Sequence, residues 1–217
     1  IVKPPHAVEA SILLAFPDVY DIGMSYHGFK ILYERVNAVR GWAAERAFAP
    51  WPDMEALMRE AGLPLYALES KRPALAFDYV GFKLQHELNY TNALNMIDLA
   101  GAAVEAAERP DPFPLFIGGG EGALAPEPLA PFLDLFVVGD GEEPLDALMA
   151  LAAEFKREGG AKADPRRSKA ALLRRAACIP GVYVPSLIDF EYGGDGTPAR
   201  IVSRETGSTQ SKVPVER

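Results

Sequence analysis

The stretch Asp78–Leu84 (D-Y-V-G-F-K-L) decides the fold, because it predicts a buried strand that leads directly into a helix. Its short, mostly apolar run of β-branched and aromatic residues is typical of a strand inside a sheet. A helix is predicted after it, from about Thr91 to Leu99. A strand followed by a helix is the repeating half of a parallel βαβ arrangement.

The same alternation continues outward in both directions. Further strands are predicted at Ser11–Phe16, Ala44–Ala49, Leu65–Leu68, Pro114–Ile117 and Leu135–Val138. Further helices are predicted from Ser25 as a possible N-cap, at Met54–Ala61, and from Pro144 to about Arg157. The sequence therefore predicts a doubly wound, mainly parallel α/β sheet of the Rossmann-like kind, with helices on both faces.

The pattern changes after Glu158. Residues 1–158 are predicted to form the α/β domain, and 159–205 a connector, a short basic helix (Ser168–Ala177) and a β-hairpin. The hairpin strands are expected at Tyr183–Tyr192 and Ala199–Ser203, with glycine-rich turn chemistry between them. The polar residues 206–217 are expected to be a linker or tail.

Composition narrows the class of protein. The 217 residues are 49% hydrophobic and 24% charged, the mix of a soluble globular protein. No apolar run is long enough for a membrane span, and the first residues lack the pattern of a signal peptide. The net charge of −8 argues against broad binding to nucleic acid. One basic cluster, Arg166–Arg175, is either a solvated helix face or an RNA site.

Cysteine and histidine usage argues against a resident metal. Cys178 is the single cysteine, so no internal disulfide, iron–sulfur cluster or structural zinc site can form from cysteines of this chain. A chain without disulfides fits the cytoplasm, and Cys178 is expected to be buried and inert. The three histidines have no metal-ligand spacing, and capping or solvated roles are favoured for His27 and His86.

Four loops are expected to meet at the carboxyl edge of the sheet, where ligands of open α/β folds bind. They are Pro17–Ser25, Gln85–Asn92, Gly118–Pro128 and Gly139–Glu143. Gly118, Gly119 and Gly120 either let a flat ligand approach the backbone or form a tight turn. In the last loop Gly139, Gly141 and Glu142 either contact a ligand or simply begin a helix, whose dipole favours acidic residues there. No G-x-G-x-x-G fingerprint or P-loop is present, so nucleotide phosphate binding by those motifs is not predicted.

Several motifs resemble one large class of proteins. They are F-P-D-V-Y-D-I-G-M-S (Phe16–Ser25), K-I-L-Y-E (Lys30–Glu34), F-A-P-W-P-D-M-E-A-L (Phe48–Leu57), L-N-Y-T-N-A-L-N-M-I-D-L-A-G (Leu88–Gly101), P-E-P-L (Pro126–Leu129) and V-V-G-D-G-E-E (Val137–Glu143). Over roughly residues 10–190 the chain resembles the N-terminal, cobalamin-binding-like domain of radical S-adenosylmethionine (radical SAM) proteins. The resemblance implies a following radical SAM domain of the same polypeptide, in which three cysteines hold a [4Fe–4S] cluster that cleaves S-adenosylmethionine. Those cysteines are not in these 217 residues, so no catalytic residue is assigned here.

The resemblance also implies candidate cobalamin contacts at Asp18, Tyr20 and Gly23. Cobalamin-binding domains carry D-x-H-x-x-G there, with a histidine on cobalt, whereas this chain has Tyr20 at the histidine position. Tyrosine, with a pKa near 10, is a poor cobalt ligand at neutral pH. A corrinoid, if bound, is therefore expected to bind without histidine ligation.

Two functions follow as hypotheses. The first is an accessory domain that positions a cofactor, such as cobalamin, or a substrate for the radical SAM domain. The alternative is a non-catalytic domain that contacts protein or RNA through the basic helix and the hairpin.

Overall fold

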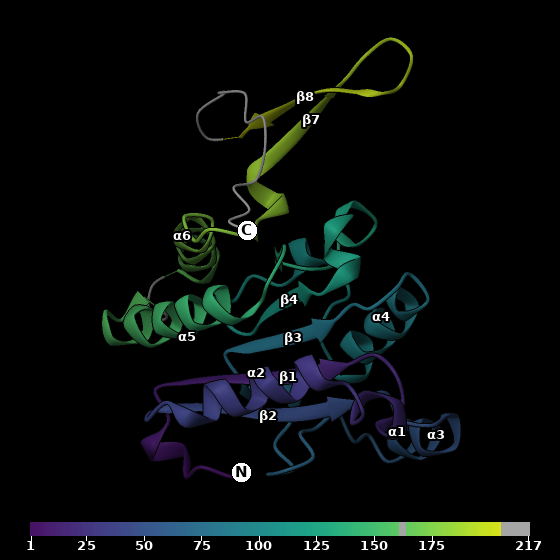
Figure 1. Ribbon diagram of the computed structural model, residues 1–217, viewed down its shortest axis with the longest axis vertical. Coiled ribbons are helices and arrows are strands. Elements are labelled where there is room, and N and C mark those ends of the chain that lie inside the picture. Colours follow the sequence, from purple (N-terminus) through teal and green to yellow (C-terminus); the bar gives the residue numbers. More distant parts are fainter. Residues whose placement is uncertain (161–163, 205–217) are drawn as a thin grey trace.

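The computed structural model describes residues 1–160 and 164–204. A six-stranded sheet forms its centre (Figure 1). The strand order is β2-β1-β3-β4-β5-β6. These strands are β1 (Ala10–Phe16), β2 (Trp42–Phe48), β3 (Tyr79–Lys83), β4 (Leu115–Gly119), β5 (Leu135–Val137) and β6 (Val182–Tyr183). All neighbours from β2 to β5 pair in parallel, and β6 is antiparallel to β5. The prediction of a mainly parallel α/β sheet is confirmed.

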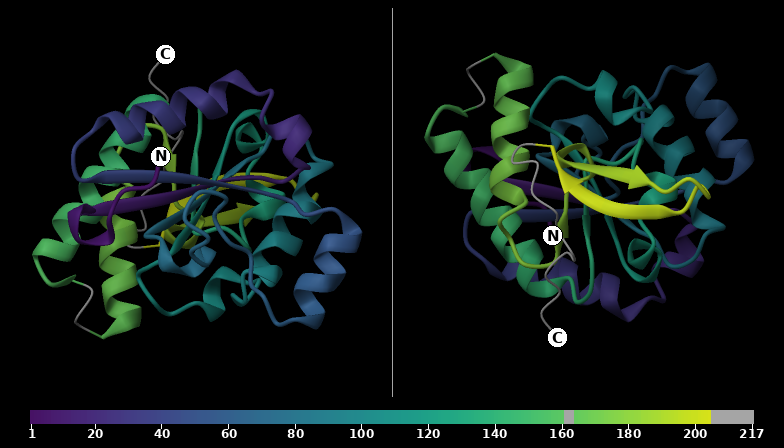
Figure 2. Two further views of the ribbon diagram at one scale, coloured as in Figure 1. Left: turned by 90° about the horizontal axis from the view of Figure 1, so that it is seen from below. Right: turned by 90° about the horizontal axis from the view of Figure 1, so that it is seen from above.

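Helices cover both faces of this sheet (Figure 2). They are α1 (Tyr20–Gly23), α2 (His27–Ala38), α3 (Pro52–Glu60), α4 (Asn89–Leu99), α5 (Glu142–Arg157) and α6 (Pro165–Ala176). One core joins the sheet to α2, α5 and α6, and a second core joins the other face to α3 and α4. Between β4 and β5 the chain forms only short 3-10 turns, η4 (Glu121–Leu124) and η5 (Glu127–Leu129).

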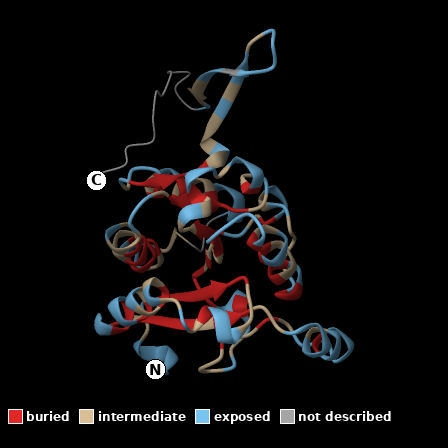
Figure 3. Ribbon diagram, turned by 45° about the vertical axis from the view of Figure 1, so that its right-hand side comes forward, coloured by how far each residue is buried: buried red, intermediate tan, exposed pale blue. Residues whose placement is uncertain are grey.

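The strands are buried because their side chains alternate between the two cores (Figure 3). In β1, Ile12 and Leu14 belong to the core under α2 and α5, whereas Leu13 and Ala15 belong to the core under α3 and α4. A strand with both faces covered reads as a continuous apolar run rather than an alternating one. This is why Ser11–Phe16 and Asp78–Leu84 were recognisable from sequence.

The hairpin extends away from the body and consists of β7 (Ile188–Tyr192) and β8 (Pro198–Ser203) (Figure 1). The predicted hairpin is confirmed, but its first strand begins later than expected. Tyr183 belongs instead to β6, where it pairs with Phe136 at the edge of the main sheet. The predicted tail at 206–217 lies outside the described residues.

Two local predictions were wrong. The Leu65–Leu68 segment forms only an isolated bridge, Tyr66 with Pro73, because Leu65 N–H bonds to the end of α4 and Ala67 N–H to a turn. Ser25 does not cap α2; its hydroxyl donates to the carbonyl of Ile22 at 2.7 Å. The residue that precedes α2 is Tyr26, which makes no side-chain cap.

Candidate functional site

The four predicted loops leave β1, β3, β4 and β5 at one edge of the sheet, because these strands are parallel. The chain runs from β1 outward to β2, and then returns past β1 to β3 and the later strands. The order therefore reverses between β1 and β3. Open α/β sheets bind ligands in the crevice at this kind of reversal, outside the carboxyl ends of the strands.

A groove of about 370 Å³ lies at this edge, over the face of the sheet that carries α2 and α5. Its floor includes Gly81 of β3 and Gly119 of β4, and its walls include Gly28 of α2 and Gly141 before α5. A Cβ added at Gly119 would meet nothing closer than Val137 Cβ at 4.0 Å. The hollow therefore exists because the residue at this floor position has no side chain.

The next residue, Gly120, is required for the backbone itself. Its φ is +104°, and an added Cβ would lie 2.4 Å from Lys83 Nζ and 2.8 Å from the Leu84 carbonyl oxygen. Side chains with a Cβ rarely adopt this conformation. The triple glycine thus combines a turn that needs glycine with a floor position that leaves space.

Charged and phenolic groups meet at the lining of the groove. The ammonium of Lys83 forms an ion pair with Glu121, and the Tyr26 hydroxyl donates to Glu121 Oε1 at 3.2 Å. Lys83 Nζ also lies 4.6 Å from the centroid of the Tyr26 ring. The hydrogen bond from Lys83 is the main reason that the pKa of Glu121 lies below its usual value. A ligand entering here meets an ammonium and a carboxylate that already neutralise each other.

Asparagines of α4 hold the neighbouring loops in place. Asn92 Nδ2 donates to the Pro17 carbonyl at 3.0 Å, and Asn89 Nδ2 donates to the same oxygen at 3.3 Å. The Tyr90 hydroxyl donates to the Gly122 carbonyl at 3.1 Å. The segment Leu88–Gly101 therefore ties the loop after β1 and the loop after β4 to the loop after β3. The sequence pattern singled out this segment but did not show this role.

Five of the nine predicted contact residues line the groove, and four do not. Those that line it are Gly119, Gly120, Gly139, Gly141 and Glu142. Gly118 points to the opposite face, where an added Cβ would lie 2.7 Å from Phe136. This follows from the alternation of neighbouring residues along a strand.

The other three, from the loop after β1, lie toward β2. Asp18 Oδ1 accepts from the N–H of Val19 at 2.7 Å. Tyr20 packs edge-on against Phe48, with ring centroids 5.3 Å apart. An added Cβ on Gly23 would lie 2.4 Å from the same Phe48 ring. These positions thus serve local packing, and the groove is lined instead by Tyr26, Lys83 and Glu121, which the sequence analysis did not select.

Large apolar side chains are exposed on the loops around the groove. Trp51 follows β2, Leu88 follows β3 and Leu124 follows β4, with exposed fractions of 59%, 81% and 69%. Tyr20 and Ile22, after β1, are each about half exposed. What these residues share is their position, because all of them lie on segments that follow strands at the carboxyl edge of the sheet.

Other candidate chemistry is sparse in the part of the chain that the structure describes. No group of three or more His, Cys, Asp or Glu residues there could hold a metal ion. Cys178 is exposed, so the expectation of a buried thiol was wrong. No helix among the described residues is both long and apolar enough to cross a membrane.

Comparison with known proteins found one family. The family described as "Radical SAM proteins, N-terminal" matches residues 28–185, which is more than half of the chain. The matched range includes the loops after β3, β4 and β5, and it begins after Asp18, Tyr20 and Gly23. No curated protein and no solved structure matched the chain.

Proposed function

The chain belongs to the family of radical SAM N-terminal domains, and on this premise we propose that it holds a flat ligand in the groove and presents it to a radical SAM catalytic domain of the same protein. The observation that carries the proposal is the position of the groove. It lies at the carboxyl ends of the strands beside the reversal of strand order, and its floor is opened by Gly81 and Gly119. The [4Fe–4S] cluster and S-adenosylmethionine would belong to the catalytic domain.

The exposed apolar side chains at the carboxyl edge support this arrangement. Trp51, Leu88 and Leu124 come from three different loops at the same edge as the groove. We propose that the catalytic domain covers these side chains, which would close the groove and exclude water from it. The asparagine links from α4 to Pro17 would keep the loops in position while the two domains meet.

Cobalamin is the flat ligand proposed first, and the lining residues decide how it could bind. The groove volume, about 370 Å³, is at the small end of ligand pockets, so the groove would enclose one end of a corrinoid. No histidine is among the residues that line it. Tyr20 packs against Phe48 instead of lining the groove. A corrinoid in the groove would therefore be held by the lining residues without a histidine of this groove on cobalt.

Each part of the groove would have a defined task. The backbone at Gly119 and Gly141 would lie against the flat ligand, because no side chain intervenes. Lys83, Glu121 and Tyr26 would orient its polar groups, such as amides. The ammonium of Lys83 would donate and the carboxylate of Glu121 would accept, and the contacts among the three side chains would hold them in position. Bound cobalamin would supply the redox and group-carrying chemistry of its cobalt.

Retention of hydroxocobalamin after desalting, read by visible absorbance, tests this proposal. The wild-type chain should retain the corrinoid, and Gly119→Leu should weaken binding about tenfold or more. The leucine side chain would occupy the space that the ligand needs; overpacking costs about 1–3 kcal/mol, and each 1.4 kcal/mol is about tenfold in affinity. Gly194→Leu is the matched control, because an added Cβ there has no neighbour within 4 Å and lies in the hairpin.

The cobalt ligand is tested by the same measurement. His27→Ala and His86→Ala should leave the spectrum of the bound corrinoid unchanged. A wild-type chain that retains no corrinoid would refute cobalamin as the ligand. Equal retention by wild type and Gly119→Leu would place the ligand outside the groove.

A further inference from the structure

A second cavity, the basic cleft, lies beside the β6 edge of the sheet and shares no lining residue with the groove. Its volume is about 870 Å³. It is bounded by α6 on one side, by β7 of the hairpin on another, and by the segment before β5. The cleft thus lies between the basic helix and the hairpin, the two elements on which the alternative hypothesis of protein or RNA contact rests.

The cleft is positive although the chain carries a net charge of −8. Its basic lining residues are Arg109, Arg166, Lys169, Arg174 and Arg204. Its acidic lining residues are Glu127, Asp134 and Asp189. Among the described residues that line the cleft, five basic side chains stand against three acidic ones, and this excess of positive charge attracts an anionic ligand.

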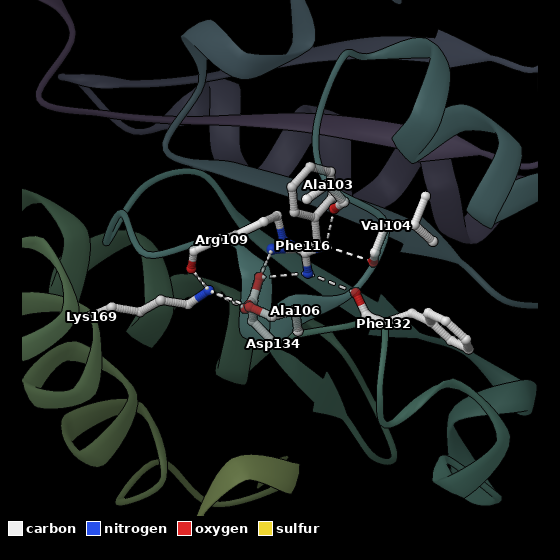
Figure 4. A network of polar contacts seen from close by, with 8 residues as sticks. All are labelled: Ala103, Val104, Ala106, Arg109, Phe116, Phe132, Asp134 and Lys169. Atoms are coloured by element: carbon white, nitrogen blue, oxygen red, sulfur yellow. Dashed lines mark hydrogen bonds and ion pairs between the residues drawn. The ribbon is translucent and has the colours of Figure 1, made fainter.

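Part of this excess is built into the protein interior (Figure 4). Asp134 pairs with Lys169 at 2.7 Å and with Arg109 at 3.4 Å, so two cations share one carboxylate. The three side chains are 1%, 10% and 8% exposed, respectively. Burial lowers the pKa of Arg109, and its buried Nε has no hydrogen-bond partner among the described residues. A charge held in a low-dielectric interior is screened less than a surface charge.

One face of α6 adds the exposed cationic side chains of Arg166 and Arg174 to this buried charge. Arg166, Lys169 and Arg174 all line the cleft, with Ala170 and Leu173 between them. Their spacing of three, four, seven and eight residues is that of a single helix face. The basic cluster predicted from sequence therefore divides, and only part of it faces the cleft.

The opposite wall is aromatic. Ile188, Phe190 and Tyr192 alternate along β7, and all three line the cleft. Alternate residues of a strand share one face, so the two rings lie on the same side of the hairpin. Tyr192 is 64% exposed. Aromatic side chains beside a positive groove are the combination with which proteins bind single-stranded nucleic acid.

We propose that the basic cleft binds nucleotide units, with phosphate on the basic face of α6 and a base against Phe190 or Tyr192. Such a unit could be a free nucleotide or part of single-stranded RNA, since both present a phosphate joined to a flat base. An acidic peptide would satisfy the cations and leave the aromatic face unused. Because few cations line the cleft, binding depends on a small number of phosphates and falls with salt.

Fluorescence anisotropy of a labelled oligouridine of about 12 nucleotides tests the proposal, since single-strand sites span about 4–16 nucleotides. We expect the full 217-residue chain to bind it at about 50 mM salt and to lose affinity toward about 200 mM. Arg166→Glu with Arg174→Glu should weaken binding about tenfold or more, and Tyr192→Ala severalfold, because a base would lose an aromatic ring on which to stack. Arg40→Glu with Arg157→Glu is the matched control, because neither residue lines the cleft.

Milder changes and competitors complete the test. Arg166→Gln and Tyr192→Ala alter exposed positions, so they report on binding even if the double charge reversal fails to fold. Competition by uridine monophosphate at comparable concentration would identify a free nucleotide, and competition only by oligouridine would identify RNA. The proposal is overturned by absence of binding to both at low salt, by equal loss in the control pair, or by tighter binding of an oligoglutamate peptide.

Discussion

The groove and the basic cleft lie in one small protein, but different kinds of residues line them. The groove has a floor of backbone and apolar side chains, and its ammonium and carboxylate neutralise each other. The cleft has an excess of cations and an exposed aromatic wall on a projecting hairpin. If both proposals hold, the groove would select its ligand by shape, whereas the cleft beside β6 would select its ligand by charge. Salt should therefore weaken binding at the cleft far more than at the groove.

The two sites also differ in what holds them. The groove depends on the backbone conformation of a few glycines, whereas the cleft depends on charges buried between elements. Asp134 accepts a hydrogen bond from Phe116 N–H at 2.8 Å in addition to its two ion pairs. It thus links the start of β5 to β4, to α6 and to the segment before β4. Substitution of Asp134 is therefore the strongest test of this contrast between the two sites.

The largest expected effect is that of Asp134→Asn on stability. The substitution leaves the cations of Arg109 and Lys169 buried without their counter-charge. Removal of one partner from a buried pair costs about 3–5 kcal/mol in free energy of unfolding, measurable by urea denaturation. Asp189→Asn is the matched control, because its pair with Arg204 is more than half exposed on each side, and it should cost about 0–1 kcal/mol. Similar losses in free energy of unfolding for the two variants would show that the charges around Asp134 are not part of the protein core.

The next effect sharpens the description of the groove. Gly120→Ala should lower the free energy of unfolding by about 1–3 kcal/mol, because it forces a strained backbone and a clash with Lys83 and Leu84. Gly119→Ala, one residue earlier, meets only Val137 at 4.0 Å and should change stability by about 0.5 kcal/mol or less. Comparable losses at the two positions would contradict the distinction between a glycine needed for the turn and a glycine that leaves space.

Much of the architecture was predictable because its signals are local. Ser11–Phe16 and Asp78–Leu84 are short apolar runs next to helical patterns, and such a signal needs no knowledge of the rest of the chain. The two-residue strand β6 was missed because it is shorter than any pattern that periodicity can show. The buried role of Asp134 was missed because Arg109 and Lys169 are distant in sequence.

The site was predictable only in part for a related reason. The loops after β4 and β5 were selected by their glycines, and four of these glycines line the groove together with Glu142. The loop after β1 was selected by its place at the carboxyl edge, and Asp18, Tyr20 and Gly23 within it by resemblance. Tyr20 and Gly23 lie instead against Phe48 of β2. Gly81 gave an unused signal, since a glycine inside a strand often marks a close approach to the backbone. The meeting of Lys83 with Glu121 depends on tertiary structure, so sequence spacing could not reveal it.

The smallest expected effect concerns this ion pair and the pH dependence of stability. The pKa of Glu121 is lowered in the folded protein, chiefly by the hydrogen bond from Lys83, so its ionised form stabilises the fold above the unfolded pKa. That contribution should be lost as pH falls from about 4.5, the usual value, through the lowered pKa. Because the Glu121 side chain is 60% exposed, solvent screening limits the contribution to about 1 kcal/mol or less. Urea denaturation of wild type and Glu121→Gln should therefore differ slightly at neutral pH and converge in acid. A difference that grows in acid would mean that Glu121 is stabilised in its protonated form, and the neutral balance of charge at the groove would then be wrong.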